Sequence, residues 1–141
     1  QTHNNITLVY HNIKPVSVFG NELQRKFPQY SEGLRNSFTF LIRQLIKAQI
    51  FGCACCLSRK NINSLLPFPS SVYAHDHWLA VWAAINGRIF FLDDTLVKYR
   101  QHDSNLTPLQ HLSIKTILIL RYKFILQICT AMYRRAFRKA A

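Results

Sequence analysis

The C-terminal stretch of the chain constrains its fold more than any other feature. Residues 109–141 contain no Gly, no Pro and no acidic residue, and apolar side chains recur among them at helical spacing. We therefore predict one long helix over residues 111–139. Its wide apolar face is formed by Ile114, Ile117, Leu118, Leu120, Phe124, Ile125, Ile128 and Cys129. Arg121 and Lys123 interrupt the apolar run, so a simple membrane span of about 20 apolar residues is not expected.

Positive charge is concentrated in the same stretch. The 141 residues carry 18 Lys and Arg against 6 Asp and Glu, which gives a net charge of +12. Residues 1–110 account for +5 of this charge and residues 111–141 for +7. A basic amphipathic helix of this kind either packs on the body of the protein with a solvated basic end or lies on an anionic membrane surface. The sequence leaves both interpretations open.

Composition excludes a disordered tail and disfavours nucleic-acid binding. Hydrophobic residues make up 49% of the chain and aromatic residues 13%, which is enough to form a core. Proteins that bind single-stranded nucleic acid place aromatic and basic side chains on one shared face. Here the aromatic residues concentrate in residues 73–99, away from the basic tail, so we expect no nucleic-acid partner.

The body of the chain alternates between strand-like and helix-like segments, which predicts an α/β fold. Apolar periodicity and turn signals place helices at 36–48, 61–66 and 74–86 and strands at 6–10, 16–19, 51–57, 89–92 and 95–100. Asp93-Asp94 is interpreted as a turn between the last two strands. We divide the chain into a body, residues 1–110, and a basic amphipathic helix, residues 111–141.

Three of the four cysteines lie in one short apolar run. Cys53, Cys55 and Cys56 are too close in sequence to pair easily with one another on a strand, and we interpret them as small buried apolar side chains in a reducing compartment. A zinc site formed by Cys53, Cys55, His75 and His77 is the alternative, and its ligand spacing argues against it.

The sequence His75-Asp76-His77-Trp78 opens the helix predicted at 74–86. Asp76 has two interpretations. An acid at a helix N-terminus can simply cap the helix. It can also act as a general base, because a carboxylate flanked by imidazole and indole rings is partly desolvated and is therefore a stronger base.

A second polar cluster, Tyr99-Arg100-Gln101-His102, follows the last apolar strand. His102 is either a metal ligand or an ordinary surface histidine. Arg100 can bind phosphate with two parallel hydrogen bonds, or it can pair with Asp93 or Asp94.

An ordered set of motifs across residues 8–105 resembles the acceptor-side half of family 2 glycosyltransferases with the GT-A fold, in particular their rhamnosyltransferase-like branch. The set comprises Leu8-Val9-Tyr10-His11-Asn12, Gly20-Asn21-Glu22-Leu23, Gly52-Cys53, Arg59-Lys60, Leu66-Pro67-Phe68-Pro69, His75-Asp76-His77-Trp78-Leu79-Ala80, Gly87-Arg88-Ile89, Leu92-Asp93-Asp94-Thr95-Leu96-Val97, Tyr99-Arg100-Gln101-His102 and Asn105.

The resemblance implies a role for each matching residue. Asp76 would be the general base that takes a proton from the acceptor hydroxyl during an inverting displacement. The acceptor site would be lined by Gly52, His75, His77 and Trp78. Arg100 would lie near the donor diphosphate, and His102 would complete the coordination of Mg²⁺ or Mn²⁺.

The resemblance also implies a donor-binding part of the family's fold, to which nothing in residues 1–141 corresponds. The family's Asp-x-Asp metal ligands and nucleotide-binding strands come before the segment that Leu8 begins, and residues 1–7 contain no acid. We therefore expect the isolated chain to be inactive. With that part, a nucleotide-sugar donor and a saccharide or lipid-linked saccharide acceptor are the expected partners, in cell-surface polysaccharide or lipopolysaccharide synthesis.

The expected location is the cytoplasm, or the inner face of the cytoplasmic membrane with residues 111–141 against the lipid. The alternative function is a non-enzymatic, basic module that binds a membrane surface.

Overall fold

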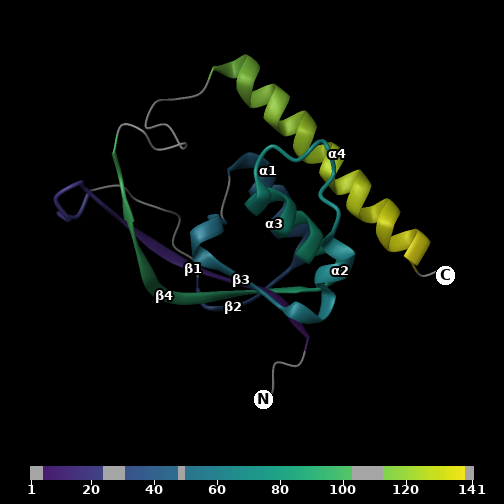
Figure 1. Ribbon diagram of the computed structural model, residues 1–141, viewed down its shortest axis with the longest axis horizontal. Coiled ribbons are helices and arrows are strands. Elements are labelled where there is room, and N and C mark those ends of the chain that lie inside the picture. Colours follow the sequence, from purple (N-terminus) through teal and green to yellow (C-terminus); the bar gives the residue numbers. More distant parts are fainter. Residues whose placement is uncertain (1–4, 24–30, 48–49, 103–112, 139–141) are drawn as a thin grey trace.

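Two long parallel strands form the centre of the protein. The computed structural model describes residues 5–23, 31–47, 50–102 and 113–138. Strand β1 (Ile6–Val16) pairs in parallel with β4 (Arg88–Arg100), from Ile6 opposite Arg88 to Val16 opposite Arg100. The short strands β2 (Gly33–Arg35) and β3 (Cys55–Leu57) pair antiparallel with β4 and β1, which gives the order β2-β4-β1-β3 (Figure 1). The fold is thus mixed α/β, as predicted.

Each central strand is longer than the sequence predicted. The strand predicted at 6–10 continues to Val16, and the strand predicted at 16–19 is wrong, because Ser17 and Gly20 form a turn. In that turn the Gly20 N–H donates to the Ser17 carbonyl over 2.9 Å, and Gly20 has a φ of 87°. Pairing along the whole of β1 satisfies backbone groups that a separate strand would leave without partners.

Asp93 and Asp94 lie inside β4, so the predicted turn between two strands is wrong. Leu92 is opposite His11 and Thr95 is opposite Asn12, so the two acids form a bulge within the ladder. The side-chain amide of Asn12 donates to Asp93 Oδ1 over 2.9 Å and bridges this bulge.

The helices agree with the sequence prediction more closely. Their bounds are α1 (Ser37–Ile46), α2 (Ile62–Leu65), α3 (His75–Asn86) and α4 (Ile114–Arg138). Asn36 begins α1 as its N-cap, with its side-chain oxygen accepting from the Thr39 N–H over 3.1 Å. The buried strand predicted at 51–57 is wrong in its first half, where a 3₁₀ turn, η1 (Gly52–Ala54), precedes β3.

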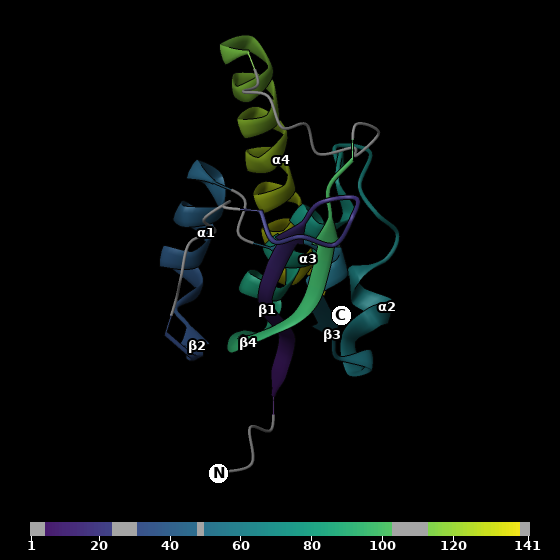
Figure 2. The ribbon, with the colours of Figure 1, turned by 90° about the vertical axis from the view of Figure 1, so that its left-hand side faces the viewer.

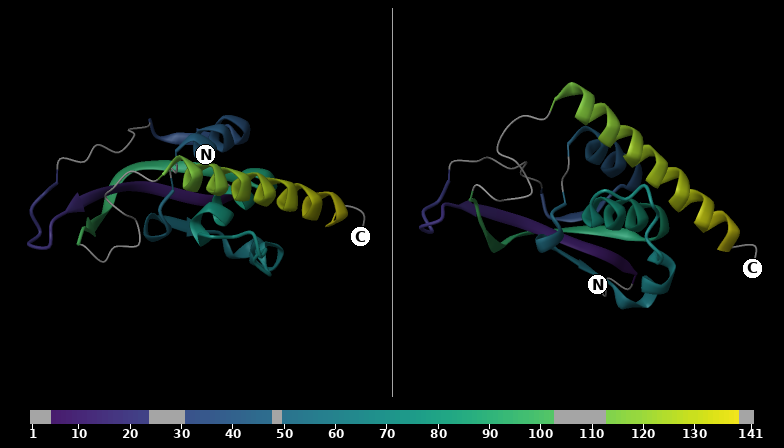
Figure 3. Two further views of the ribbon diagram at one scale, coloured as in Figure 1. Left: turned by 90° about the horizontal axis from the view of Figure 1, so that it is seen from above. Right: turned by 45° about the horizontal axis from the view of Figure 1, so that its top comes forward.

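Helix α3 lies at the centre of the core, between the sheet and α4 (Figures 1 and 3). Almost every residue from the third position of α3 onward is buried, as expected for a helix that is apolar on all sides. The core around it includes Leu8, Phe40, Trp78, Trp82, Ile89, Phe91, Phe124 and Ala131. Its first residues, where the sequence placed the catalytic candidates, are the part of α3 that reaches the surface.

Three arginines of α4 hold it on the body. Arg121 donates to the Ile46 carbonyl over 2.5 Å, Arg134 donates to the Pro67 carbonyl over 2.8 Å, and Arg135 donates to the Ile85 carbonyl. Ile46 and Ile85 lie at the C-terminal ends of α1 and α3, where carbonyl groups lack helical partners and carry partial negative charge. These charges therefore face the body, and α4 packs on it. No helix in the described ranges is long and apolar enough to cross a membrane.

Gly87, at the end of α3, offers a stability test of this packing. A Cβ atom at Gly87 would lie 1.7 Å from Thr7 Oγ1 and 2.4 Å from Thr7 Cβ, and Thr7 is buried. We expect Gly87→Ala to lower the free energy of unfolding by roughly 1–3 kcal/mol, because β1 must move to admit the methyl group. The measurement is urea unfolding.

Gly52→Ala is the matched control. The three atoms nearest to a Cβ there all belong to the ring of His75, with Nε2 at 2.3 Å, and His75 is exposed and can rotate away. We expect its effect to stay within about 0.5 kcal/mol. Equal losses in the two variants would contradict this account of the α3–β1 junction.

Candidate functional site

The candidate site lies at the N-terminal end of α3, where three segments far apart in the sequence meet. Gly52 in η1 is packed against the ring of His75, so closely that any larger residue would displace that ring. The rings of Phe51 and Tyr99 contact each other with centroids 6.5 Å apart, which joins the η1 turn to the end of β4. The first turn of α3, the η1 turn and the end of β4 therefore form one region.

Asp76 is the acid of this region. It is half-buried in the first turn of α3, and its Oδ1 accepts a hydrogen bond from the His77 N–H over 2.9 Å. The N-cap residue is Ala74, so Asp76 is not the N-cap, although it does bind one N–H of the first turn. Its other carboxylate oxygen has no donor among the described residues. That oxygen is available to accept a proton from a ligand.

The negative charge of Asp76 raises the pKa values of three neighbouring side chains. Burial is the main cause that raises the pKa of the Cys55 thiol to about 11, and Asp76 is the second cause. Burial also raises the pKa of Tyr73 to about 12, with Asp76 adding to it while Arg121 opposes it. The pKa of Cys53 is raised by burial and by Asp76. Asp76 thus lies close to both the η1 turn and the residues that precede α3.

His77 and Trp78, which the resemblance assigns to the acceptor site, lie below this surface, in the core. His77 is hydrogen-bonded through Nδ1 to the Tyr73 hydroxyl over 2.6 Å and packs edge-on against Phe124. Trp78 is fully buried and donates from Nε1 to the Leu65 carbonyl over 3.1 Å, with Arg134 over its ring. The packing of both residues in the core holds the first turn of α3, which carries Asp76, in place. Gly52 and His75 remain at the surface beside it.

The burial of His77 predicts a pH dependence of stability. Burial lowers the pKa of His77 below 6.5, and Arg121 lowers it further, whereas Asp76 opposes both. The unfolded chain therefore binds a proton at this residue before the folded chain does. The free energy of unfolding should fall as the pH drops below about 6.5, by at most about 1.4 kcal/mol per pH unit.

Urea unfolding between pH 7.5 and pH 5 measures this slope. We expect His77→Gln to flatten it and His75→Gln, the change at the exposed neighbour, to leave it intact. The same slope in both variants would assign the effect to other groups.

Arg100 and His102 are exposed at the end of β4. Arg100 donates to the Val18 carbonyl across the strand pair. Between them lies Gln101, which sequence reasoning did not single out. It is buried, and neither polar atom of its side chain has a hydrogen-bond partner within the described ranges. Alternate residues of a strand share a face, so Gln101 and Tyr99 lie on the face that carries η1. Its only sequence signal was a polar residue directly after an apolar strand.

The cysteines differ from the prediction that they are buried. Cys53 and Cys56 are exposed and Cys55 is half-buried, because the run forms a surface turn and a short edge strand. Cys129, in α4, is also exposed. No group of three or more His, Cys, Asp or Glu side chains that could hold a metal ion occurs in the described residues, which also disfavours the zinc alternative. A metal ion bound by His102 would need further ligands.

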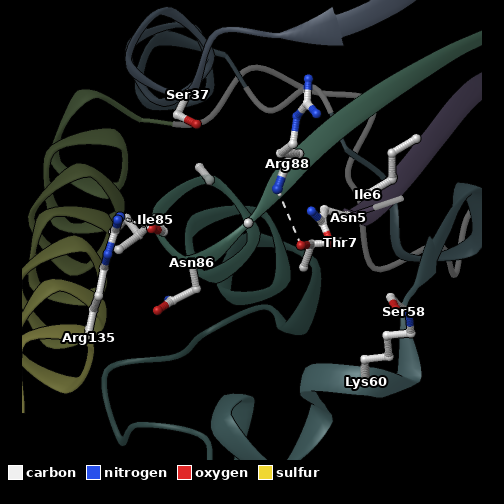
Figure 4. Close-up of a pocket in the computed structure, with 12 residues that line it drawn as sticks. Asn5, Ile6, Thr7, Ser37, Ser58, Lys60, Ile85, Asn86, Arg88 and Arg135 are labelled. Atoms are coloured by element: carbon white, nitrogen blue, oxygen red, sulfur yellow. Dashed lines mark hydrogen bonds between the residues drawn. The ribbon is translucent and has the colours of Figure 1, made fainter. Parts of the chain in front are cut away.

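A pocket of about 630 Å³ opens at the opposite end of α3 (Figure 4). It lies where α3 ends and β4 begins, beside Thr7, Asn86 and Gly87. Its lining includes Lys60, Arg88 and Arg135 but no acidic side chain. It therefore lacks a carboxylate that could remove a proton from a hydroxyl, and Asp76 is not part of it.

Comparisons with protein families, with curated proteins and with solved structures found no match to this chain.

Proposed function

We propose that this chain is the acceptor-side part of an inverting glycosyltransferase of the GT-A type, which transfers a sugar from a nucleotide-sugar donor to a saccharide hydroxyl. One observation carries the proposal. The motifs around Gly52, Asp76 and Tyr99, which are separated by more than 20 residues in each case, meet in one surface region. Glycosyl transfer needs such a region, with a carboxylate open to an acceptor hydroxyl.

Asp76 is the base in the proposed reaction. The acceptor hydroxyl donates to the open carboxylate oxygen, and its oxygen attacks the anomeric carbon of the donor sugar. The bond from that carbon to the nucleoside diphosphate breaks as the new glycosidic bond forms, and the proton passes to Asp76. Attack from the side opposite the leaving group inverts the anomeric configuration. The buried remainder of α3 keeps the carboxylate in place.

The neighbours of Asp76 have positioning roles in this proposal. The missing side chain of Gly52 leaves room for the His75 ring against the η1 backbone, and His75 directly precedes Asp76 in the first turn of α3.

Arg100 and His102 are assigned to the donor side. The guanidinium of Arg100 suits a diphosphate, because its planar fork matches phosphate oxygens. A Mg²⁺ or Mn²⁺ ion bound by His102 would need further ligands from outside the described residues, and such an ion would stabilise the leaving diphosphate. The role of Asp76 does not depend on this ion.

The proposal is tested by a transfer assay with the intact protein that contains this chain. Purified protein is incubated with a panel of nucleotide sugars, a cell-surface saccharide acceptor and Mg²⁺ or Mn²⁺. Release of nucleoside diphosphate that depends on the acceptor is the expected result. Absence of acceptor-dependent release with every donor would overturn the proposal.

A further inference from the structure

Helix α4 presents a second apolar face, which points away from the body. Phe124, Gln127 and Ala131 form its buried inner face. On the outer side, exposed apolar and aromatic residues recur at steps of three or four from Ile114 to Ile125, and Met132 and Tyr133 follow about two turns later, which gives one stripe along the helix. This outer stripe consists of Ile114, Leu118, Tyr122, Ile125, Met132 and Tyr133. Figures 1 and 3 show α4 on the outside of the molecule, across α3.

The apolar surface continues onto α1. Helix α1 meets α4 where Arg121 donates to the Ile46 carbonyl, and the Ile46 side chain is exposed at this junction. Ile42 and Phe38 precede it at steps of four along α1 and are also exposed. A contiguous exposed apolar surface of this kind marks an interaction site more often than a face that stays in water.

Charge decides between two occupants of the outer stripe. Helix α4 contains no acidic residue, and the whole chain has 18 basic residues against 6 acidic ones. A second copy on the stripe would bring two basic helices together without acids to pair them. An anionic lipid surface supplies the opposite charge. Lys115 is exposed at the edge of the stripe, where its ammonium group can reach phosphate groups while its stem stays on apolar surface.

Three arginines of α4 are directed toward the body and away from the stripe. Arg121, Arg134 and Arg135 donate to carbonyl groups of the body, so their charges do not interrupt the apolar side chains of the outer stripe. An interfacial helix needs this arrangement, with one face at the boundary of headgroups and acyl chains and the charges at its sides.

We propose that the outer stripe of α4 docks the protein on an anionic lipid bilayer, with α4 lying parallel to the surface. His77 contacts Phe124 on the inner side of α4, which places the neighbouring Asp76 close to this helix. If the proposed function holds, this docking brings a lipid-linked saccharide within reach of the carboxylate. The docking itself uses no residue of the candidate site.

Flotation with lipid vesicles tests this proposal on the intact protein. One set of vesicles contains phosphatidylcholine with phosphatidylglycerol, and the other contains phosphatidylcholine alone. The variant is the double change Leu118→Gln with Ile125→Gln. Its matched control is Leu96→Gln, because Leu96 and Leu118 are both 64% exposed and Leu96 lies on β4. All of these side chains are at the surface, so circular dichroism should show unchanged folding.

We expect binding to the anionic vesicles to exceed binding to neutral vesicles by at least about tenfold. The double variant should lose about tenfold or more of that binding, since each side chain gives up a buried apolar contact with lipid. The control should bind like the wild type, and Asp76→Asn should float like the wild type even if it abolishes transfer.

Three results would overturn the proposal. One is equal binding to both kinds of vesicle, or no binding. Another is an equal loss in the double variant and in Leu96→Gln. The third is a dimer in sedimentation equilibrium that the double variant dissociates, which would assign the stripe to a second copy of the chain.

Discussion

Replacing Asp76 with Asn should lower kcat of the proposed glycosyl transfer by about 10²–10⁴-fold, the usual contribution of a positioned general base. The amide is nearly the same size as the carboxylate and still offers an oxygen to the His77 N–H, so the first turn of α3 should stay folded. Because Asn cannot take the proton of the acceptor hydroxyl, the loss should appear in kcat and leave donor binding unchanged. The measurement is acceptor-dependent release of nucleoside diphosphate.

The matched control is Asp93→Asn. Asp93 is exposed in the bulge of β4 and accepts from the side chain of Asn12, and its hydrogen bonds within the described residues involve neither η1 nor α3. We expect this change to leave kcat within about threefold of wild type. If Asp76→Asn behaved like Asp93→Asn, Asp76 would not be the base. Such a result would leave vesicle docking by α4 untouched.

The second large effect concerns Trp78. Its ring is fully buried and its Nε1 donates to Leu65, so Trp78→Ala should cost about 3–5 kcal/mol. The whole free energy of unfolding of such a domain is about 5–15 kcal/mol. The variant should therefore be largely unfolded at moderate temperature, as seen by urea unfolding or by loss of near-ultraviolet circular dichroism.

The conservative changes Trp78→Phe and Trp82→Phe distinguish the stability contributed by the Nε1 hydrogen bond from that contributed by burial of the ring. Both tryptophans are buried, but the Nε1 of Trp82 has no partner in the described chain, whereas that of Trp78 does. We expect Trp78→Phe to cost about 1 kcal/mol more than Trp82→Phe. If Trp78→Phe left stability intact and instead raised the KM for the acceptor, Trp78 would be a ligand contact after all.

Local signals were enough to predict the helices. Helix α1 has apolar residues at helical spacing and an Asn at its N-cap, and both features can be recognised in the sequence without knowledge of the fold. The same holds for α3, which is followed by Gly87. The order of strands and helices therefore predicted the α/β class.

Long-range contacts determined what the sequence did not predict. The bulge at Asp93 exists because β4 pairs with β1 beyond it, and a run ending in two acids is equally consistent with a turn. Gly52 begins a 3₁₀ turn that packs against His75, whereas an apolar run of this length is also typical of a buried strand.

The candidate site was predicted in part for the same reason. Asp76, His75 and Gly52 could be named from their motifs and do lie together at the surface. The burial of His77 and Trp78 depends on packing against α4 and Leu65, which no local pattern encodes. The inward direction of Arg121, Arg134 and Arg135 likewise depends on where α1, α2 and α3 end. A basic helix with a wide apolar face was therefore predicted, but which part of that face packs on the body was not.

The stereochemistry of transfer tests the central claim most directly. A nucleotide sugar of known anomeric configuration is given to the intact protein, and the configuration of the new glycosidic bond is read by nuclear magnetic resonance from the coupling at the anomeric proton. A single displacement with Asp76 as base predicts inversion, lost together with activity in Asp76→Asn. Retention of configuration, or inversion at an unchanged rate in that variant, would contradict the account.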